Sequence, residues 1–236
     1  MHLIYKVWRA DSPQALCNDF KSETRHERRS YEGVQVDAMN EAKQFLAETK
    51  DVNCQLQGNN GATCLWLAAE QGHADVVQEI LRHPKIDPNK VRFSTKTTPL
   101  LIAAYHGHDE VVEALLGHAD IQVNVGSTDT GASPLFMAVQ EGREGSVEIL
   151  LRQNNIDANK PTEKGITPLC VAAELGHEHI VRLLLQVADI NVRHTLKDGT
   201  TAMSTAVSHG HRKTVGMLEA HSTAGTIGSS STVGDF

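Results

Sequence analysis

Paired histidines and scattered cysteines are the residues of this chain whose types and spacing could support chemistry. The chain of 236 residues holds 13 histidines and four cysteines. Two imidazoles separated by one residue can share a metal ion, and three pairs have this spacing: His106/His108, His177/His179 and His209/His211. No cysteine or carboxylate ligand stands at a suitable spacing, and the metalloprotease sequence H-E-x-x-H does not occur. We therefore predict neither a metal site nor a bound cofactor.

Catalysis by a cysteine would require a thiolate beside a general base. Cys17 and His26 share the N-terminal segment, but no catalytic signature surrounds either residue. The remaining three cysteines fall at positions that a packed core would occupy: Cys54, Cys64 and Cys170. The phosphate-binding sequences G-x-x-x-x-G-K-S/T and G-x-G-x-x-G are also absent. The sequence thus indicates no enzyme.

Composition and charge exclude further classes of protein. Apolar residues make up 40% of the chain and charged residues 22%, which is typical of a soluble globular protein. The formal net charge of −7 argues against non-specific binding of nucleic acid, which depends on cationic contacts to phosphates. No apolar run approaches the roughly 18 residues of a membrane span, and no C-x-x-C pair or glycosylation sequon occurs. We expect a cytoplasmic, reduced protein without membrane insertion and without a nucleic-acid partner.

A repeated pattern organises most of the chain. Five segments align with one another: Thr63–Ala69, Thr98–Ala104, Ser133–Val139, Thr167–Ala173 and Thr201–Val207. A glycine follows each segment at the same distance, with separations of 35, 35, 34 and 34 residues: Gly72, Gly107, Gly142, Gly176 and Gly210. A second apolar stripe follows each glycine, and an asparagine closes the first four repeats: Asn89, Asn124, Asn159 and Asn191. A fixed period of this length is typical of a repeat architecture.

Each repeat predicts two helices. The threonine or serine at its start is a preferred N-cap residue, and three repeats place a proline at the first helical position, where its missing N–H costs nothing. The glycine supplies the left-handed residue that ends the first helix. The second stripe has apolar residues at i, i+1, i+4 and i+5, which is one face of a helix. Because neither helix buries its face alone, we expect neighbouring repeats to stack.

The repeat resembles the ankyrin repeat, whose pattern reads T-P-L-x-x-A-A-x-x-G-H-x-x-V-V-x-x-L-L. Thr98–Leu116 carries nearly all of this pattern, and the resemblance covers Asn53 to Ala220, about 70% of the chain. It implies an all-α repeat solenoid, an ankyrin-repeat stack of antiparallel helix pairs joined by β-turn or hairpin fingers. The repeats are expected near residues 63–89, 98–124, 133–159, 167–191 and 201–220.

The repeats depart from the family pattern after T-P-L, where a histidine is usual. This chain has mainly apolar residues there, so we expect apolar packing in place of a hydrogen bond between finger and helix: Trp66, Leu101, Phe136, Cys170 and Ser204. The last repeat is polar and carries Gly216 in its second helix, as in a capping repeat. Four histidines occupy the G-H position, where we expect them to serve the turn between helices: His73, His108, His177 and His211. If these imidazoles become charged together near pH 6.5, stability will depend on pH.

Two segments flank the repeats. Residues 1–52 are expected to form an N-terminal helical cap with a degenerate half repeat at 39–53, and an independent functional segment is the alternative. Residues 221–236 are rich in Gly, Ser and Thr, which predicts a flexible tail.

The family resemblance implies binding of a partner protein through the finger tips and the concave face of the first helices. The tips carry a combined charge of +4, which favours a partner with an acidic patch: Gln57–Asn60, Lys90–Thr97, Ser127–Thr130, Lys160–Lys164 and Arg193–Asp198. Aromatic residues and arginines are the usual anchors of an interface. The candidate binding residues are Glu70, Gln71, Arg92, Phe93, Lys96, Tyr105, His106, Gln140, Glu141, Glu174 and Leu175, with Trp66 if its packing leaves it partly exposed.

The sequence therefore predicts a non-catalytic protein-binding module, such as a scaffold or adaptor. One alternative is an effector that a microbe delivers into the cytosol of a host cell. A second is a regulatory part of a larger enzyme. A third is a homo-oligomer joined through an exposed end of the stack, at Trp8 or Leu218. We expect a monomer, with a homodimer as the alternative.

Overall fold

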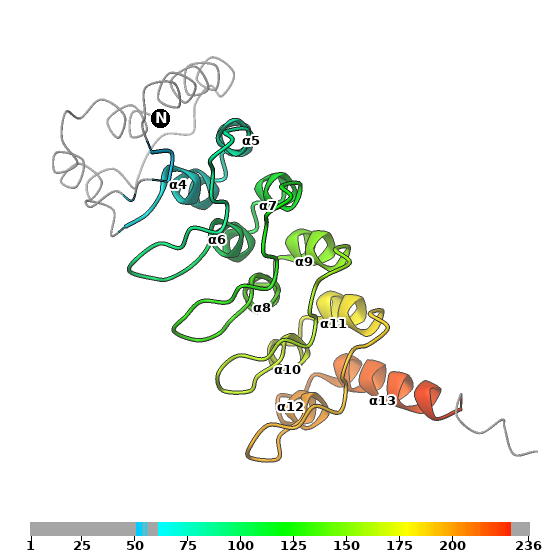
Figure 1. Cartoon of the computed structure of the whole chain (residues 1–236). Helices are drawn as coiled ribbons and strands as arrows, with labels where there is room; N and C mark the ends of the chain where they lie inside the picture. Colours follow the sequence, from blue (N-terminus) through cyan, green and yellow to red (C-terminus); the bar gives the residue numbers. More distant parts are fainter. Residues whose placement is uncertain (1–50, 54, 56–60, 228–236) are drawn as a thin grey trace, which may run out of the picture. The chain divides into compact units, whose positions relative to one another are not determined.

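The structure is a computed structural model that describes residues 51–53, 55 and 61–227 (Figure 1). Within these residues the chain forms successive helix pairs and no strand. The pairs are α4 (Cys64–Gln71) with α5 (Ala74–Leu81), α6 (Pro99–His106) with α7 (Asp109–Leu116), α8 (Pro134–Gln140) with α9 (Glu144–Leu151), α10 (Pro168–Leu175) with α11 (Glu178–Leu185), and α12 (Ala202–Ser208) with α13 (Arg212–Ile227). Each pair coincides with one repeat of the sequence, as predicted. The cap predicted for residues 1–52 lies almost entirely outside the described residues.

The described helices belong to two compact units. Unit 1 runs to Ala103 and includes His108–Gln122 and Ser127–Asp129, whereas unit 2 comprises Ala104–Gly107, Val123–Gly126 and the chain from Thr130 onward. In unit 1, α4 and α7 both pack against α5. In unit 2, the first helices α8, α10 and α12 lie in one row and the second helices α9, α11 and α13 in another (Figure 1). Repeats therefore stack within each unit, as expected of helix pairs that cannot bury their apolar faces alone.

Each first helix begins at the threonine or serine that the sequence marks as its N-cap. The hydroxyl oxygen of Thr63 accepts a hydrogen bond from the N–H of Trp66 at 3.1 Å, and the same bond recurs at Thr98, Ser133, Thr167 and Thr201. The first four of these caps are buried. The prediction of five capped helices is confirmed, and a cap of this kind contributes about 1 kcal/mol.

The glycine that follows each first helix is left-handed in all five repeats, with φ between 66° and 75°. At Gly72 a side chain would also meet a neighbour, because a Cβ atom there would lie 2.7 Å from Nδ1 of His108. Glycine is thus required both by backbone conformation and by the close approach of the next repeat.

The core of each repeat is built from the same positions. One leucine in each of the first four first helices is at most 1% exposed, as is the paired valine of each second helix: Leu65, Leu100, Leu135 and Leu169, with Val77, Val112, Val147 and Val181. In the last repeat Val207 is 60% exposed, although Ala173 at the equivalent position is fully buried. No other repeat of the described residues covers this position, and the exposure agrees with the polar character of the last repeat. Leu218 is only 1% exposed, so the alternative of a homo-oligomer contact through Leu218 is wrong.

Asparagine side chains connect the closing turns of successive repeats. Asn89 donates from Nδ2 to the carbonyl oxygen of Asp120 at 2.7 Å, and its Oδ1 accepts from the N–H of Gln122 at 2.8 Å. The same two bonds recur at Asn53, Asn124 and Asn159. Satisfying these backbone groups fixes the distance between neighbouring turns. Asn53 therefore occupies the closing position that the sequence predicted for the degenerate half repeat.

The described fingers are short hydrogen-bonded turns rather than extended hairpins. The finger of the second repeat closes through the N–H of Arg92 and the carbonyl oxygen of Thr97 at 3.0 Å, and equivalent bonds close the fingers near Thr162 and Leu196. The tip predicted at Gln57–Asn60 lies outside the described residues.

The second helix of the last repeat is longer than predicted. Helix α13 continues to Ile227 and so includes residues 221–227, which the sequence assigned to a flexible tail. Leu218 anchors this helix in the core, and Ser222 donates its hydroxyl to the carbonyl oxygen of Leu218 at 2.9 Å. A serine that bonds back to its own helix in this way does not interrupt the helix.

Candidate protein-binding surface

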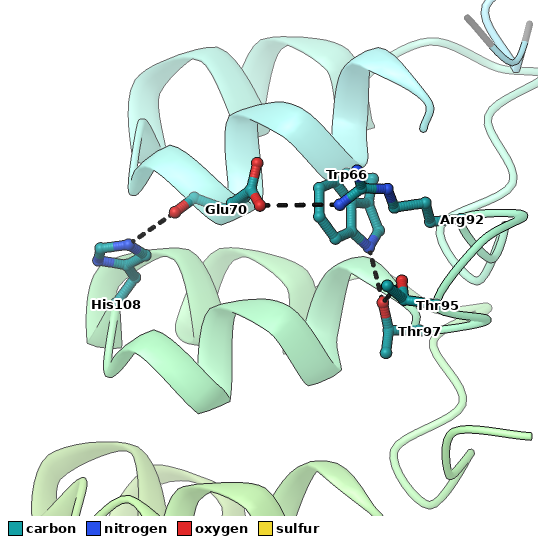
Figure 2. A network of polar contacts seen from close by, with 6 residues as sticks. All are labelled: Trp66, Glu70, Arg92, Thr95, Thr97 and His108. Atoms are coloured by element: carbon teal, nitrogen blue, oxygen red, sulfur yellow. Dashed lines mark hydrogen bonds and ion pairs between the residues drawn. The ribbon is translucent and has the colours of Figure 1, made fainter. Parts of the chain in front are cut away.

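Trp66 is a core residue in unit 1 rather than a surface residue. Its side chain is 1% exposed, so the condition under which it would contact a partner is not met. Its indole N–H donates to the hydroxyl of Thr97 in the next finger at 3.1 Å, and that hydroxyl lies 2.8 Å from the hydroxyl of Thr95 (Figure 2). Apolar packing was expected to replace the hydrogen bond between helix and finger. At Trp66 this expectation is wrong, because the indole makes such a bond.

Arg92 is turned into the protein, where it covers Trp66. Its guanidinium carbon lies 4.4 Å from the centroid of the Trp66 ring, and Nη1 lies 3.9 Å from Oε1 of Glu70 (Figure 2). The side chain of Arg92 is only 20% exposed. Its Nε atom is buried without a hydrogen-bond partner. The structure therefore makes Arg92 a support of the finger and leaves it little surface for an outside partner.

Glu70 is the counter-ion of Arg92 and lies at the edge of the same cluster. Burial raises the pKa of the Glu70 carboxyl above its usual value, and the charge of Arg92 opposes this rise. The carbonyl oxygen of Glu70 is also bonded to Nε2 of His108 at 3.0 Å (Figure 2). Glu70 thus joins the end of α4 to the next repeat in two ways.

Phe93 follows Arg92 and faces solvent. It is 76% exposed, more than either of the other large apolar residues that are exposed in the described part of the chain. Its backbone N–H donates to the carbonyl oxygen of Gly61 at 3.3 Å. We call the exposed tip formed by Phe93, Ser94, Thr95 and Lys96 the finger patch.

Lys96 has the only positive φ, 48°, among the described residues that are not glycine. In other repeats a glycine with positive φ stands at this position, two residues before the N-cap: Gly61, Gly131, Gly165 and Gly199. The sequence alone shows this recurring glycine and its replacement by lysine in one of the five repeats. A left-handed lysine costs about 1 kcal/mol, so the charge is held at the tip against a conformational preference.

The ends of the first helices in unit 2 carry the remaining candidates. They occupy two equivalent positions in successive repeats: Tyr105 and His106, Gln140 and Glu141, and Glu174 and Leu175. Gln140, Glu174 and Leu175 are exposed and the other three are half-buried. Leu175 is an exposed apolar residue at 45%. We call these six residues the helix-end patch. Gln71 is exposed at the corresponding position in unit 1.

The comparison with protein families agrees with this geometry. A family model described as ankyrin repeats, in three copies, matches residues 34–129, 85–162 and 135–224. The chain belongs to the ankyrin-repeat family. Ankyrin repeats generally mediate protein–protein interaction, and the family is typically non-catalytic. The match begins at residue 34 and therefore includes the segment 39–53, where the sequence predicted a degenerate ankyrin half repeat. No curated protein matched the chain.

Two of the four G-H histidines, His108 and His211, connect one repeat to the previous one by a hydrogen bond, whereas Nε2 of His177 is buried without a hydrogen-bond partner. His211 bonds through Nε2 to the carbonyl oxygen of Glu174 at 2.9 Å, as His108 does to Glu70. In the third repeat Arg143 stands at this position, and its Nε donates to the carbonyl oxygen of Tyr105 at 3.1 Å. The predicted role in the turn between helices is therefore incomplete, because these side chains also cross to the preceding repeat.

The residues considered for chemistry are packed or dispersed in the part of the chain that the structure describes. Cys64 and Cys170 are buried, whereas Cys17 and Cys54 lie outside the described residues. No group of three or more His, Cys, Asp or Glu side chains in that part could hold a metal ion. None of its helices has the length and apolar character needed to span a membrane.

Proposed function

We propose that this ankyrin-repeat chain is a non-catalytic module that binds a partner protein through the finger patch of unit 1, and that the helix-end patch of unit 2 is a separate binding surface. The observation that carries the proposal is the exposure of Phe93 on a finger closed by backbone hydrogen bonds. Large aromatic residues are enriched among the few side chains that carry most of the binding energy of an interface. Lys96, held at the same tip in a left-handed conformation, supports a functional finger.

The charge of the finger indicates the chemistry of the partner. The finger Lys90–Thr97 carries +3, and of its three cations Arg92 is paired within the protein by Glu70. Lys90 and Lys96 therefore leave a positive field around the Phe93 ring. We infer a partner with an apolar pocket for this ring and acidic residues around the pocket. Such complementary charges contribute orientation and association rate more than affinity.

The helix-end patch has the opposite character. Glu141 is the residue that ends α8, and Glu174 precedes the exposed Leu175 in the last turn of α10. Helices α8 and α10 pack side by side. We infer that this patch contributes a second, acidic-rimmed apolar contact. The buried free thiol of Cys170 supports a role in the reducing cytoplasm.

The test is affinity capture with the wild type beside Phe93→Ala, followed by measurement of the dissociation constant with the purified partner. Val207→Ala is the matched control, because Val207 is also an exposed apolar residue, at 60%. We expect Phe93→Ala to weaken binding by about thirtyfold or more, as loss of an anchor residue does, and Val207→Ala to leave it unchanged. Equal binding by all three proteins would refute the placement. A partner captured only from a lysate of host cells would indicate an effector. A partner captured from a lysate of the cells that make this protein would indicate an adaptor.

A further inference from the structure

We propose that Arg92 is a positioning residue, which holds the finger at residues 91–97 in one conformation so that Phe93 projects from it. The proposal rests on the proposed function of Phe93. It assigns Arg92 a role inside the protein, through stacking on Trp66, instead of a direct contact with the partner.

The backbone around Arg92 closes the finger. The N–H of Arg92 donates to the carbonyl oxygen of Thr97 at 3.0 Å, and its own carbonyl oxygen accepts from the N–H of Lys96 at 2.7 Å. Both bonds of the turn therefore involve Arg92. A displacement of this residue opens the turn that carries Phe93.

Trp66 holds both arms of this turn. Arg92 in the first arm lies over the face of the indole, at 4.4 Å from the ring centroid, and Thr97 in the second arm accepts the indole N–H at 3.1 Å (Figure 2). The ring itself is 1% exposed and is fixed in the core of the first repeat. A desolvated guanidinium over tryptophan is the strongest form of the cation–π interaction.

The electrostatic surroundings keep Arg92 in this place. Glu70 supplies the opposite charge at 3.9 Å, although burial opposes its ionisation. The Nε atom of Arg92 makes no hydrogen bond and is buried, which costs free energy. The guanidinium of Arg92 therefore contacts the Trp66 ring and Glu70 more than it contacts solvent.

Close packing against Gly61 is a third constraint on the backbone of Phe93. Gly61 has a φ of 76°, and a Cβ atom added there would collide with the Cβ of Phe93 and lie 3.1 Å from its backbone nitrogen. The backbone of Phe93 therefore passes directly over Gly61, to which its N–H is bonded. With the arms held by Trp66 and the tip held by Gly61, the phenyl ring is presented in advance of binding. Such preorganisation lowers the entropy cost of association.

The experiment measures amide hydrogen exchange of Phe93 and Lys96 in the full chain without a partner. Arg92→Ala removes the stacked cation, Arg92→Lys keeps a cation that can still lie over the ring, and Lys96→Gln removes one charge from the same finger. We expect exchange to be roughly tenfold faster in Arg92→Ala, intermediate in Arg92→Lys and unchanged in Lys96→Gln. Slow exchange of amides in α10 and α11 shows that unit 2 remains folded in each variant.

Two results would overturn the proposal. The first is a finding that the finger amides of Arg92→Ala exchange at the wild-type rate. The second is a finding that Lys96→Gln accelerates their exchange as much as Arg92→Ala does, which would indicate a general effect of charge. Should Arg92→Ala fail to fold, the comparison of Arg92→Lys with Lys96→Gln decides between the same outcomes. Binding measurements keep this test separate from the proposed function: unchanged binding by Phe93→Ala refutes the binding site alone, whereas unchanged finger exchange refutes the role of Arg92 alone.

Discussion

The side chain of Asn124 donates from Nδ2 to the carbonyl oxygen of Asn155, 2.7 Å away in the next repeat. Its Oδ1 accepts the N–H of Asp157 at 2.9 Å, so one side chain satisfies two backbone groups of its neighbour. Asn191 stands at the equivalent position of the fourth repeat, but its Oδ1 accepts from the N–H of Arg193, only two residues along the chain. The contrast separates a contact between two closing turns from a contact within one turn.

We therefore predict that Asn124→Ala destabilises the protein by about 1–2 kcal/mol more than Asn191→Ala, because it removes two hydrogen bonds to the next repeat. Urea unfolding followed by circular dichroism measures both changes in the free energy of unfolding. Equal effects of the two substitutions would mean that the bonds between repeats contribute nothing beyond local turn structure.

The bond between Trp66 and Thr97 is testable by a double-mutant cycle. Trp66→Phe removes the indole N–H and so loses this one hydrogen bond. Thr97→Val removes the acceptor and also loses the bond to the Thr95 hydroxyl. We predict a coupling free energy of about 0.5–1.5 kcal/mol between the two sites. Additive single effects in urea unfolding would contradict the bond. Thr95→Val serves as a control, because Thr95 bonds Thr97 and not the indole.

Lys96 provides a prediction about backbone strain. The residue has a φ of 48° where four other repeats have glycine, so Lys96→Gly relieves an unfavourable conformation. The gain of about 1 kcal/mol is partly offset by the greater flexibility of glycine in the unfolded chain, so the expected net stabilisation is about 0.5 kcal/mol. The midpoint of urea unfolding should rise, while binding should weaken because the tip loses a charge. A decrease in stability would contradict the assigned strain.

The Glu70 carboxyl makes the stability of unit 1 vary with pH in the acidic range. Burial raises the folded-state pKa of its carboxyl above the ordinary value of 4.5. Its contribution to stability is therefore fully present below pH 4.5 and is lost as the pH rises through the folded pKa. We predict that the stability of Glu70→Gln minus that of the wild type is larger at pH 7 than at pH 4.5. Melting temperatures at the two values test this, with Glu174→Gln as a control at the equivalent, exposed position.

His73 acts in the opposite direction. Burial lowers its pKa below the ordinary 6.5, so its contribution is present above pH 6.5 and is lost as the pH falls through the lowered folded pKa. We expect a lower melting temperature at pH 5.5 than at pH 7.5, and a smaller difference in His73→Asn. The exposed His209 provides the control substitution. A wild-type melting temperature that is equal at both pH values would refute this and the sequence-based hypothesis of charging histidines.

Local features of the fold were predictable because they depend on neighbours in the sequence. The cap at Thr63 needs only the N–H three residues later, and the left-handed glycine at Gly72 needs only its own freedom at φ. The same reasoning placed residues 221–227 in a tail, because it used their composition and not the anchoring of Leu218 in the core.

By itself, the sequence determined the family and the start of each helix pair, and it placed Phe93 at a finger tip. Only the tertiary structure decided where the side chain of Arg92 lies, which the sequence had placed among the binding residues. The physical reason is distance along the chain: Trp66 and Arg92 are 26 residues apart, and their contact exists only because the second finger folds back over the first helix. A periodic pattern determines which face of a helix is buried, but it does not determine which loop covers that face.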